Sequence, residues 1–245
     1  MLNKRHLDAR RDLVIPGDTE ATLDFCCAHW VGVCKQAIQN HDAFFVALSG
    51  GTTPKAIFQQ LTSARFNPLI DWSKVHLFWS DERAVPPDHP ESNYHMAMQA
   101  GLSRVGIPAD QIHRMRAEEK IEEHAHLYEE TIHSVLQDRP FDLVMLGVGE
   151  DGHTASLFPG TQGLHAPKER LVIANYVPEK KAWRMTLTFS CINQAHHIVI
   201  YALGASKKPI LKELFSSDDM HLPAQRIGSK EQPALWIIDE AANFI

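Results

Sequence analysis

Short apolar runs alternate with segments of helical periodicity along most of this chain. Residues 18–40 carry apolar side chains at helical spacing, from Leu23 through Trp30 to Ile38, which predicts a helix. The next run, AFFVALSGG, is continuously apolar and ends in glycines, as is typical of a strand buried on both faces. TPKAIFQQL then resumes helical spacing, with Pro54 placed for a first helical turn. These segments therefore predict a strand, a turn and a helix.

The same order recurs toward the C-terminus. VHLFWSDER predicts a strand followed by a polar loop, and SNYHMAMQAGL predicts a helix with Ser92 as its cap. The amphipathic segment EEKIEEHAHLYEETIHSVL precedes the strand FDLVMLG, HIVIYALG precedes the helix SKKPILKELF, and ALWIID is the last predicted strand. Strands that alternate with helices predict an α/β fold, with a mostly parallel sheet and helices on both faces.

Two segments have a different pattern, RLVIANYV and WRMTLTFS. In the second, the apolar side chains of Trp183 and Met185 alternate with the polar side chains of Arg184 and Thr186. One apolar and one polar face are typical of a strand near a sheet edge or beside a wet cleft. We therefore expect a mixed sheet. The long polar connection that starts at Ser216 is expected to border a site.

Composition narrows the class of protein. A chain of 245 residues with 44% hydrophobic side chains can bury one large core, and we expect a single domain over residues 1–245. The formal charge of -6 is mild and is not gathered in a block, so neither a nucleic-acid partner nor a membrane surface is expected. The charged N-terminal segment lacks the apolar run of a secretory signal, and no segment reaches the roughly 20 apolar residues that span a bilayer. These observations predict a cytoplasmic protein.

The spacing of the cysteines and histidines does not indicate a metal site. Four cysteines are present without a C-x-x-C pair, which favours reduced thiols in the core. The 15 histidines include HAH at 124–126 and HH at 196–197, but no further ligand stands at a metal-binding spacing. We therefore expect solvated or structural histidines and no bound metal.

Polar clusters follow four of the predicted strands, and the carboxyl ends of parallel strands share the edge of a sheet where ligands bind. After the first, Gly50, Gly51 and Thr52 precede a helix, so backbone N–H groups and the helix dipole are available to a phosphate. Neither a Walker loop nor G-x-G-x-x-G is present there, so nucleotides are not indicated. Arg184 and Lys207 are candidates for the countercharge, although each, taken alone, is better explained as a solvated surface charge.

The loop GEDGH ends in His153, two residues after Asp151. Histidine side chains titrate near neutral pH, so an imidazole at the sheet edge is a candidate general base, and a neighbouring carboxylate can orient it. The alternative is that His153 caps a following helix or makes a hydrogen bond within the loop.

Five linked motifs resemble one family: LSGGTTPKAIFQQL, WSDERAVPPDHPESNY, LGVGEDGHTASLFPGT, RMTLT and GASKKPIL. In this order, and over roughly residues 40–240, they are similar to the signatures of the 6-phosphogluconolactonase family. The resemblance implies a modified Rossmann-like α/β fold shared with glucosamine-6-phosphate deaminases, and no cofactor. It also implies hydrolysis of 6-phosphoglucono-1,5-lactone, a small phosphosugar lactone, in the pentose phosphate pathway.

The resemblance also implies roles for the residues of these motifs. His153 would activate water for attack on the ester carbonyl, with Asp151 as a supporting group. Arg83 would face the lactone end of the sugar and stabilise the oxyanion, a task that a backbone N–H also suits. The phosphate would be held by the following set: Gly50, Gly51, Thr52, Arg184 and Lys207.

Three alternatives remain at this point. A glucosamine-6-phosphate deaminase or isomerase is the nearest, but the deaminase loop has the pattern D-G-H-I-A-F-N-E, whereas here Phe158 stands where that pattern has glutamate. Deaminases also carry tyrosine where this chain has Arg83. A phosphosugar-binding sensor without catalysis is disfavoured because Arg83, Asp151 and His153 are all present. A CoA-transferase-like protein would share only the fold.

Overall fold

A computed structural model describes residues 4–216 and 219–245 of the chain. Its larger sheet has seven strands in the order β1-β2-β10-β9-β6-β3-β4. β1 pairs antiparallel with β2, and all other neighbours in this sheet are parallel. Its strands are β1 (Arg5–Asp8), β2 (Arg11–Val14), β3 (Phe44–Leu48), β4 (Val75–Trp79), β6 (Leu143–Gly147), β9 (His197–Ala202) and β10 (Ala234–Ile238).

The predicted α/β class with a mostly parallel, mixed sheet is confirmed. Strands β3, β4, β6, β9 and β10 lie where the apolar runs place them, whereas β1 and β2 were not predicted. Both are only four residues long, and in β2 Arg11 and Asp12 are buried although they are charged, so no apolar run marks them.

The order of the strands places a crevice between β3 and β6. From β3 the chain moves outward to β4, whereas β6, β9 and β10 follow one another on the other side. In an open α/β sheet, this change of direction leaves a crevice at the carboxyl ends of the two strands, where ligands bind. The loops after β3 and β6 contain two of the four predicted polar clusters, GGTT and GEDGH.

A separate antiparallel sheet has the order β5-β8-β7 and consists of β5 (Asp81–Arg83), β7 (Val172–Val177) and β8 (Ala182–Leu187). The strand predicted in VHLFWSDER ends at Trp79, and Asp81, Glu82 and Arg83, which were expected in a polar loop, instead form β5 of this sheet. The chain leaves the large sheet at Ser80, whose N–H donates to the Leu48 carbonyl, while its own carbonyl accepts from the Leu187 N–H. Ser80 thus joins the two sheets. β8 is the central strand of this sheet, so its polar alternation does not mark an edge.

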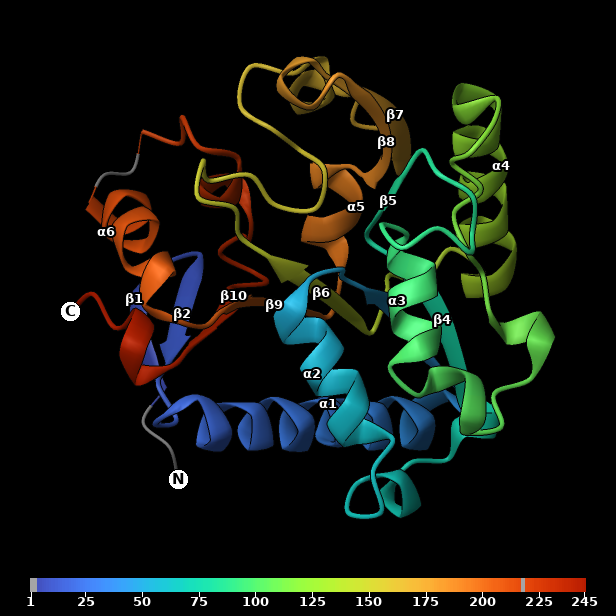
Figure 1. Ribbon diagram of the computed structural model, residues 1–245, viewed down its shortest axis with the longest axis horizontal. Coiled ribbons are helices and arrows are strands. Elements are labelled where there is room, and N and C mark those ends of the chain that lie inside the picture. The colour runs from blue at the N-terminus through green and yellow to red at the C-terminus, as the bar shows by residue number, and fades with distance from the viewer. Residues whose placement is uncertain (1–3, 217–218) are drawn as a thin grey trace.

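The predicted helices are present as α1 (Thr19–His41), α2 (Thr52–Leu61), α3 (Asn93–Gln99), α4 (Ile121–Leu136) and α6 (Lys208–Ser216). A short helix, α5 (Phe189–Gln194), replaces the predicted end of the WRMTLTFS strand. Ser92 caps α3 as predicted, because its Oγ accepts from the His95 N–H at 3.1 Å. In Figure 1, α1 runs along one side of the large sheet, and the small sheet and α5 lie on the other.

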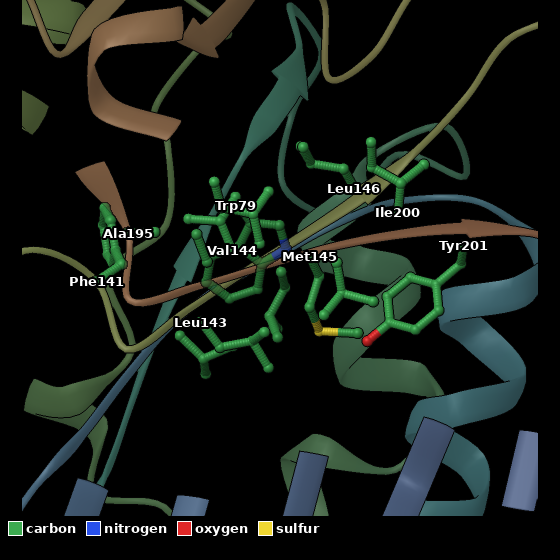
Figure 2. Close-up of a cluster of buried hydrophobic side chains, with 14 of the residues drawn as sticks. Trp79, Phe141, Leu143, Val144, Met145, Leu146, Ala195, Ile200 and Tyr201 are labelled. Carbon is green, nitrogen blue, oxygen red and sulfur yellow. The ribbon is translucent and has the colours of Figure 1, made fainter. Parts of the chain in front are cut away.

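The core is centred on the parallel strands. Figure 2 shows Leu143, Val144, Met145 and Leu146 of β6 among the side chains of neighbouring elements, and all four are buried. All four cysteines are buried without a disulfide, as predicted. Burial raises the pKa of the Cys191 thiol to about 12, so this thiol stays protonated at neutral pH.

Candidate active site

The loops that follow β3, β6 and β9 bring the predicted site residues to the carboxyl edge of the large sheet. Gly50, Gly51 and Thr52 follow β3, Asp151 and His153 follow β6, and Lys207 follows β9. The small sheet supplies Arg83 at the end of β5 and Arg184 within β8.

Helix α2 begins without a side-chain cap. Thr52 is its first residue, and the N-cap Gly51 has φ 103, a left-handed conformation that glycine adopts without strain. No acidic residue lies in the first turn, so its N–H groups and the positive end of the helix dipole are available to an anion. Gly50 makes a close approach to α3, since a Cβ there would lie 1.9 Å from the Asn93 Oδ1.

The His153 loop is held in a tight turn. The Gly149 N–H donates to the His153 carbonyl at 2.9 Å, and Gly152 has φ 75. Asp151 Oδ1 lies 2.5 Å from His153 Nδ1 and also accepts from the His153 N–H at 3.1 Å. The Phe158 ring stacks on the imidazole with 4.0 Å between centroids. No helix begins directly after this loop, so His153 caps none, whereas the hydrogen bond within the loop that the alternative also named is present.

This arrangement orients the imidazole and leaves it in contact with solvent. The His153 side chain is 28% exposed and that of Asp151 is 38% exposed. Burial by itself would raise the pKa of the Asp151 carboxyl, but the charge and hydrogen bonds of His153 outweigh burial and lower it below its usual value of 3.8. Asp151 is therefore ionised at neutral pH. When it accepts from Nδ1–H, the lone pair of the imidazole lies on Nε2.

Arg83 and Arg184 are directly opposite each other in the antiparallel pair of β5 and β8. Like charges in such a position repel, so the arrangement favours a bound anion. The Arg83 guanidinium donates to the Glu91 carbonyl at 2.5 Å, whereas no hydrogen bond or ion pair within the described ranges holds the side chain of Arg184. Burial, and then the charge of Arg83, lower the pKa of Arg184. Arg184 is thus a half-buried cation that makes no ion pair within the described ranges, although the charges of Asp81, Glu91 and Glu82 partly offset the lowering of its pKa.

Lys207 lies at the base of the His153 loop. Its Nζ donates to the Val148 carbonyl at 2.8 Å, one residue before Gly149. Gly204, with φ 94, makes the turn after β9 that brings the lysine to this position. The ammonium carries three donors and uses one of them here, so the remaining donors are available to a ligand.

The sequence did not identify the polar side chains that support the site. Glu82 is buried, and its carboxylate accepts from the N–H groups of Asn93 and Tyr94 in the first turn of α3. Burial raises the pKa of Glu82 despite these hydrogen bonds. Asn175 and Ser156 are also buried and hydrogen-bonded. Their only signal in the sequence is that they lie in strand or loop segments beside the predicted residues.

The polar connection after α6 borders the site, as expected from its sequence. Leu222 packs against Gly152, and the Ala224 N–H donates to the Gly152 carbonyl at 3.0 Å. Residues 217–218 of this connection lie outside the described residues.

Of two cavities, one lies at the carboxyl edge of the large sheet and the other lies away from it. One of about 240 Å³ is lined by Thr52, Thr53 and Gly204, beside the start of α2. Another, of about 570 Å³, is lined by residues of α4 and by His113 and Arg114, away from the predicted site residues. The chemistry of the polar loops, not cavity size, therefore locates the candidate site.

Residues 4–216 and 219–245 contain neither a metal-binding cluster nor a membrane-spanning helix. No group of three or more His, Cys, Asp and Glu side chains is arranged to hold a metal ion. None of the helices there combines the length and the apolar character that crossing a membrane requires.

The fold and the site define an α/β protein of Rossmann-like architecture, with an uncapped helix start and a histidine loop at the carboxyl edge of its sheet. The family model described as glucosamine-6-phosphate isomerases/6-phosphogluconolactonase matches residues 17–236. The chain belongs to this family.

Relatives within the family are similar over most of their length. The chain is 43% identical to 6-phosphogluconolactonase of Chlamydia pneumoniae, with 88% of this chain and 83% of that protein covered. For the protein of the same name from Nostoc sp. the identity is 37%, with coverages of 84% and 86%.

Solved structures agree with this result. 6-Phosphogluconolactonase from Trypanosoma cruzi superposes with a TM-score of 0.84 at 27% identity, and covers 98% of this chain and 97% of its own. A monomeric glucosamine-6-phosphate deaminase gives a TM-score of 0.79 at 17% identity, with coverages of 94% and 98%. That likeness shows the shared fold alone.

Proposed function

We propose that this protein is a 6-phosphogluconolactonase, which hydrolyses 6-phospho-D-glucono-1,5-lactone to 6-phospho-D-gluconate in the pentose phosphate pathway. The names and the similarity of its relatives support this function. The observation that carries it is the imidazole of His153, which has a carboxylate on Nδ1 and the ring of Phe158 against its face. Such a site contains one oriented base and suits ester hydrolysis.

In the proposed reaction, Nε2 of His153 takes a proton from water, and the resulting hydroxide attacks the lactone carbonyl carbon. The carbonyl oxygen becomes an oxyanion, and its collapse breaks the bond to the ring oxygen. The imidazolium returns its proton to that oxygen, so the base is regenerated and one water is consumed. Asp151 holds the ring orientation and stabilises the imidazolium during the reaction.

We assign the phosphate to the start of α2, with Gly50, Gly51 and Thr52 providing backbone and hydroxyl donors. Arg184 and Lys207 supply positive charge to a group that carries about -1.5 to -2 near neutral pH. Arg184 in particular has unused donors and a position that favours an anion.

Arg83 is assigned to the lactone end, where it stabilises the oxyanion. Its guanidinium is anchored to the Glu91 carbonyl and lies beside Arg184, so the charge of the pair extends along the bound sugar. A fixed cation next to the position where negative charge develops lowers the barrier to hydrolysis.

Glucosamine-6-phosphate deamination is the second candidate, because the family includes isomerases of that substrate. That reaction moves protons between sugar carbons and needs further acid–base groups. In this chain, Phe158 stacks on the imidazole where the deaminase loop pattern has glutamate. The carboxylate of Glu82 already accepts a hydrogen bond from the first N–H of α3. Both features favour the lactonase.

Two assays on one preparation test the proposal. The lactone is generated enzymatically and its loss is followed by NMR with and without the protein, since it also hydrolyses unaided, while ammonia release from glucosamine 6-phosphate is measured in parallel. We expect lactone hydrolysis without ammonia. His153→Asn is expected to lower kcat by about 10² or more. Ammonia release at a rate comparable to lactone hydrolysis, or a folded His153→Asn protein with parental turnover, contradicts the proposal.

A further inference from the structure

A chain of buried polar side chains connects the His153 loop to the loop that starts α2. Ser156 Oγ donates to Asp81 Oδ2 at 2.6 Å. Asn93 Nδ2 donates to the Asp81 carbonyl at 2.9 Å and lies 3.2 Å from Asp81 Oδ1. Asn93 in turn lies against Gly50, where no Cβ would fit. Asp81 is 6% exposed, and its carboxylate therefore accepts both from the segment that follows His153 and from α3, which packs against the loop that starts α2.

Ser156 is fixed through all its polar atoms. Besides the hydroxyl, its N–H donates to Thr186 Oγ1 at 3.2 Å, and its carbonyl accepts from Asn175 Nδ2 at 2.9 Å. Asn175 is itself held, since its Oδ1 accepts from the Gly163 N–H at 3.1 Å. Such a fully satisfied buried network is rigid, and Ser156 follows His153 by only three residues.

Asn93 is fixed in a similar way at the other end. Its N–H donates to Glu82 Oε1 at 2.8 Å, so the first turn of α3 cannot shift without breaking a buried hydrogen bond. Asn93 is 2% exposed as a whole residue, and its side chain fills the space beside Gly50. Removal of Ser156 Oγ or of the Asn93 amide would leave part of a buried carboxylate unpaired, which is costly unless the loops move.

We propose that Ser156 and Asn93 are positioning residues, which act through Asp81 to hold His153 at a fixed separation from the phosphate-binding loop. This inference rests on the proposed function, because it assigns the base to one loop and the phosphate to the other. Phosphate binding accelerates the reaction at the distant carbonyl only if the two loops keep their spacing. Neither side chain needs to touch the substrate.

The test measures kcat and KM for the phosphorylated lactone, and the Kd of 6-phosphogluconate, in Ser156→Ala, Asn93→Ala and the double variant. Thr188→Ala is the matched control. Thr188 is also buried and its hydroxyl also makes two hydrogen bonds, to the Cys191 N–H and the Arg170 carbonyl, outside the Asp81 network. Circular dichroism and thermal unfolding establish that each variant is folded. If Ser156→Ala does not fold, Ser156→Cys, which keeps the size and a weak donor, replaces it.

We expect Ser156→Ala to lower kcat by about 10- to 100-fold, because a displacement of about 1 Å has an effect of that order. The Kd of 6-phosphogluconate should change by less than about 3-fold, since the phosphate contacts remain. The double variant should have about the same kcat as the less active of the two single variants, because both substitutions break the same connection. Thr188→Ala should keep parental kcat.

Losses in kcat that multiply in the double variant would overturn the inference, as would a Ser156→Ala protein with parental kcat. An equal loss of kcat in Thr188→Ala would also overturn it, because the effect would then be one of general stability. Absence of lactone hydrolysis by the parent protein is a different result, which rejects the proposed function itself.

Discussion

Gly149 lies against the pair formed by His153 and Asp151, and its replacement by alanine tests the importance of that geometry. A Cβ at position 149 would lie 2.1 Å from His153 Nδ1 and 2.5 Å from Asp151 Oδ1. Real Cβ atoms do not approach heavy atoms closer than 3.0 Å, so the imidazole has to move by about 1 Å. Misplacement of a catalytic group by about that distance costs roughly 10²-fold in rate. We therefore expect kcat to fall about 100-fold, equivalent to about 2.7 kcal/mol of transition-state stabilisation.

The assay follows the lactone by NMR in Gly149→Ala, with Gly147→Ala as a matched control. A Cβ on Gly147 would have no atom within 4 Å, so this control changes the same residue type two positions away without a clash. The control should keep parental kcat, and both variants should bind 6-phosphogluconate as the parent does. A folded Gly149→Ala protein with more than about a third of parental kcat would show that the position of the imidazole does not limit the rate.

Further predictions concern binding, stability and pH. Arg184→Ala and Lys207→Ala should each raise KM by about 10-fold or more, with smaller losses in kcat, because each removes a charge-assisted contact worth about 1.5 to 3 kcal/mol; unchanged product affinity in titration calorimetry would contradict this. Tyr128→Phe should lower the free energy of unfolding in urea by about 2 kcal/mol, since its hydroxyl accepts from the buried backbone N–H of Trp79 at 2.9 Å on the edge strand β4. Burial lowers the pKa of His29 from 6.5 to about 4, so the unfolded state binds more protons between these pH values and stability is lost as the pH falls through this window. Urea unfolding at pH 7 and pH 4.5 should show this loss, by up to about 3 kcal/mol, and His29→Gln should reduce it.

The fold was predictable wherever one periodicity extends over a whole element. Continuous apolar runs identified the parallel strands, and helical spacing identified α1 and α4, because these patterns follow from burial on both faces of a sheet and from one buried helix face. β1 and β2 are about as short as the parallel strands but contain charged residues instead of an apolar run, and α5 begins at Phe189, which still fits the alternation of WRMTLTFS. β5 was not predicted, because Asp81, Glu82 and Arg83 are all charged and resemble the polar loop that follows a strand.

The candidate site was predictable as a set of loops but not as a set of contacts. Glycines, a histidine near a carboxylate and basic residues after apolar strands indicate chemistry at the sheet edge, and the structure places these residues there. The contact between Ser156 and Asp81 joins residues 75 positions apart, and no local pattern specifies such a pairing. The opposition of Arg83 and Arg184 likewise depends on the register of two strands that are distant in sequence.

The strand β5 explains why three adjacent charged residues have three different surroundings. Successive side chains of a strand point to opposite faces, so Asp81 and Arg83 share one face with Arg184 while Glu82 lies on the other. On that second face, the carboxylate of Glu82 accepts the first N–H groups of α3, and on the first face Asp81 accepts from Ser156. Both carboxylates are therefore committed to buried hydrogen bonds, and Arg83 is the only one of the three whose charge remains available to a bound sugar. A site with one oriented imidazole, a cationic patch and no free carboxylate pair favours attack by water on an ester over transfer of protons between sugar carbons.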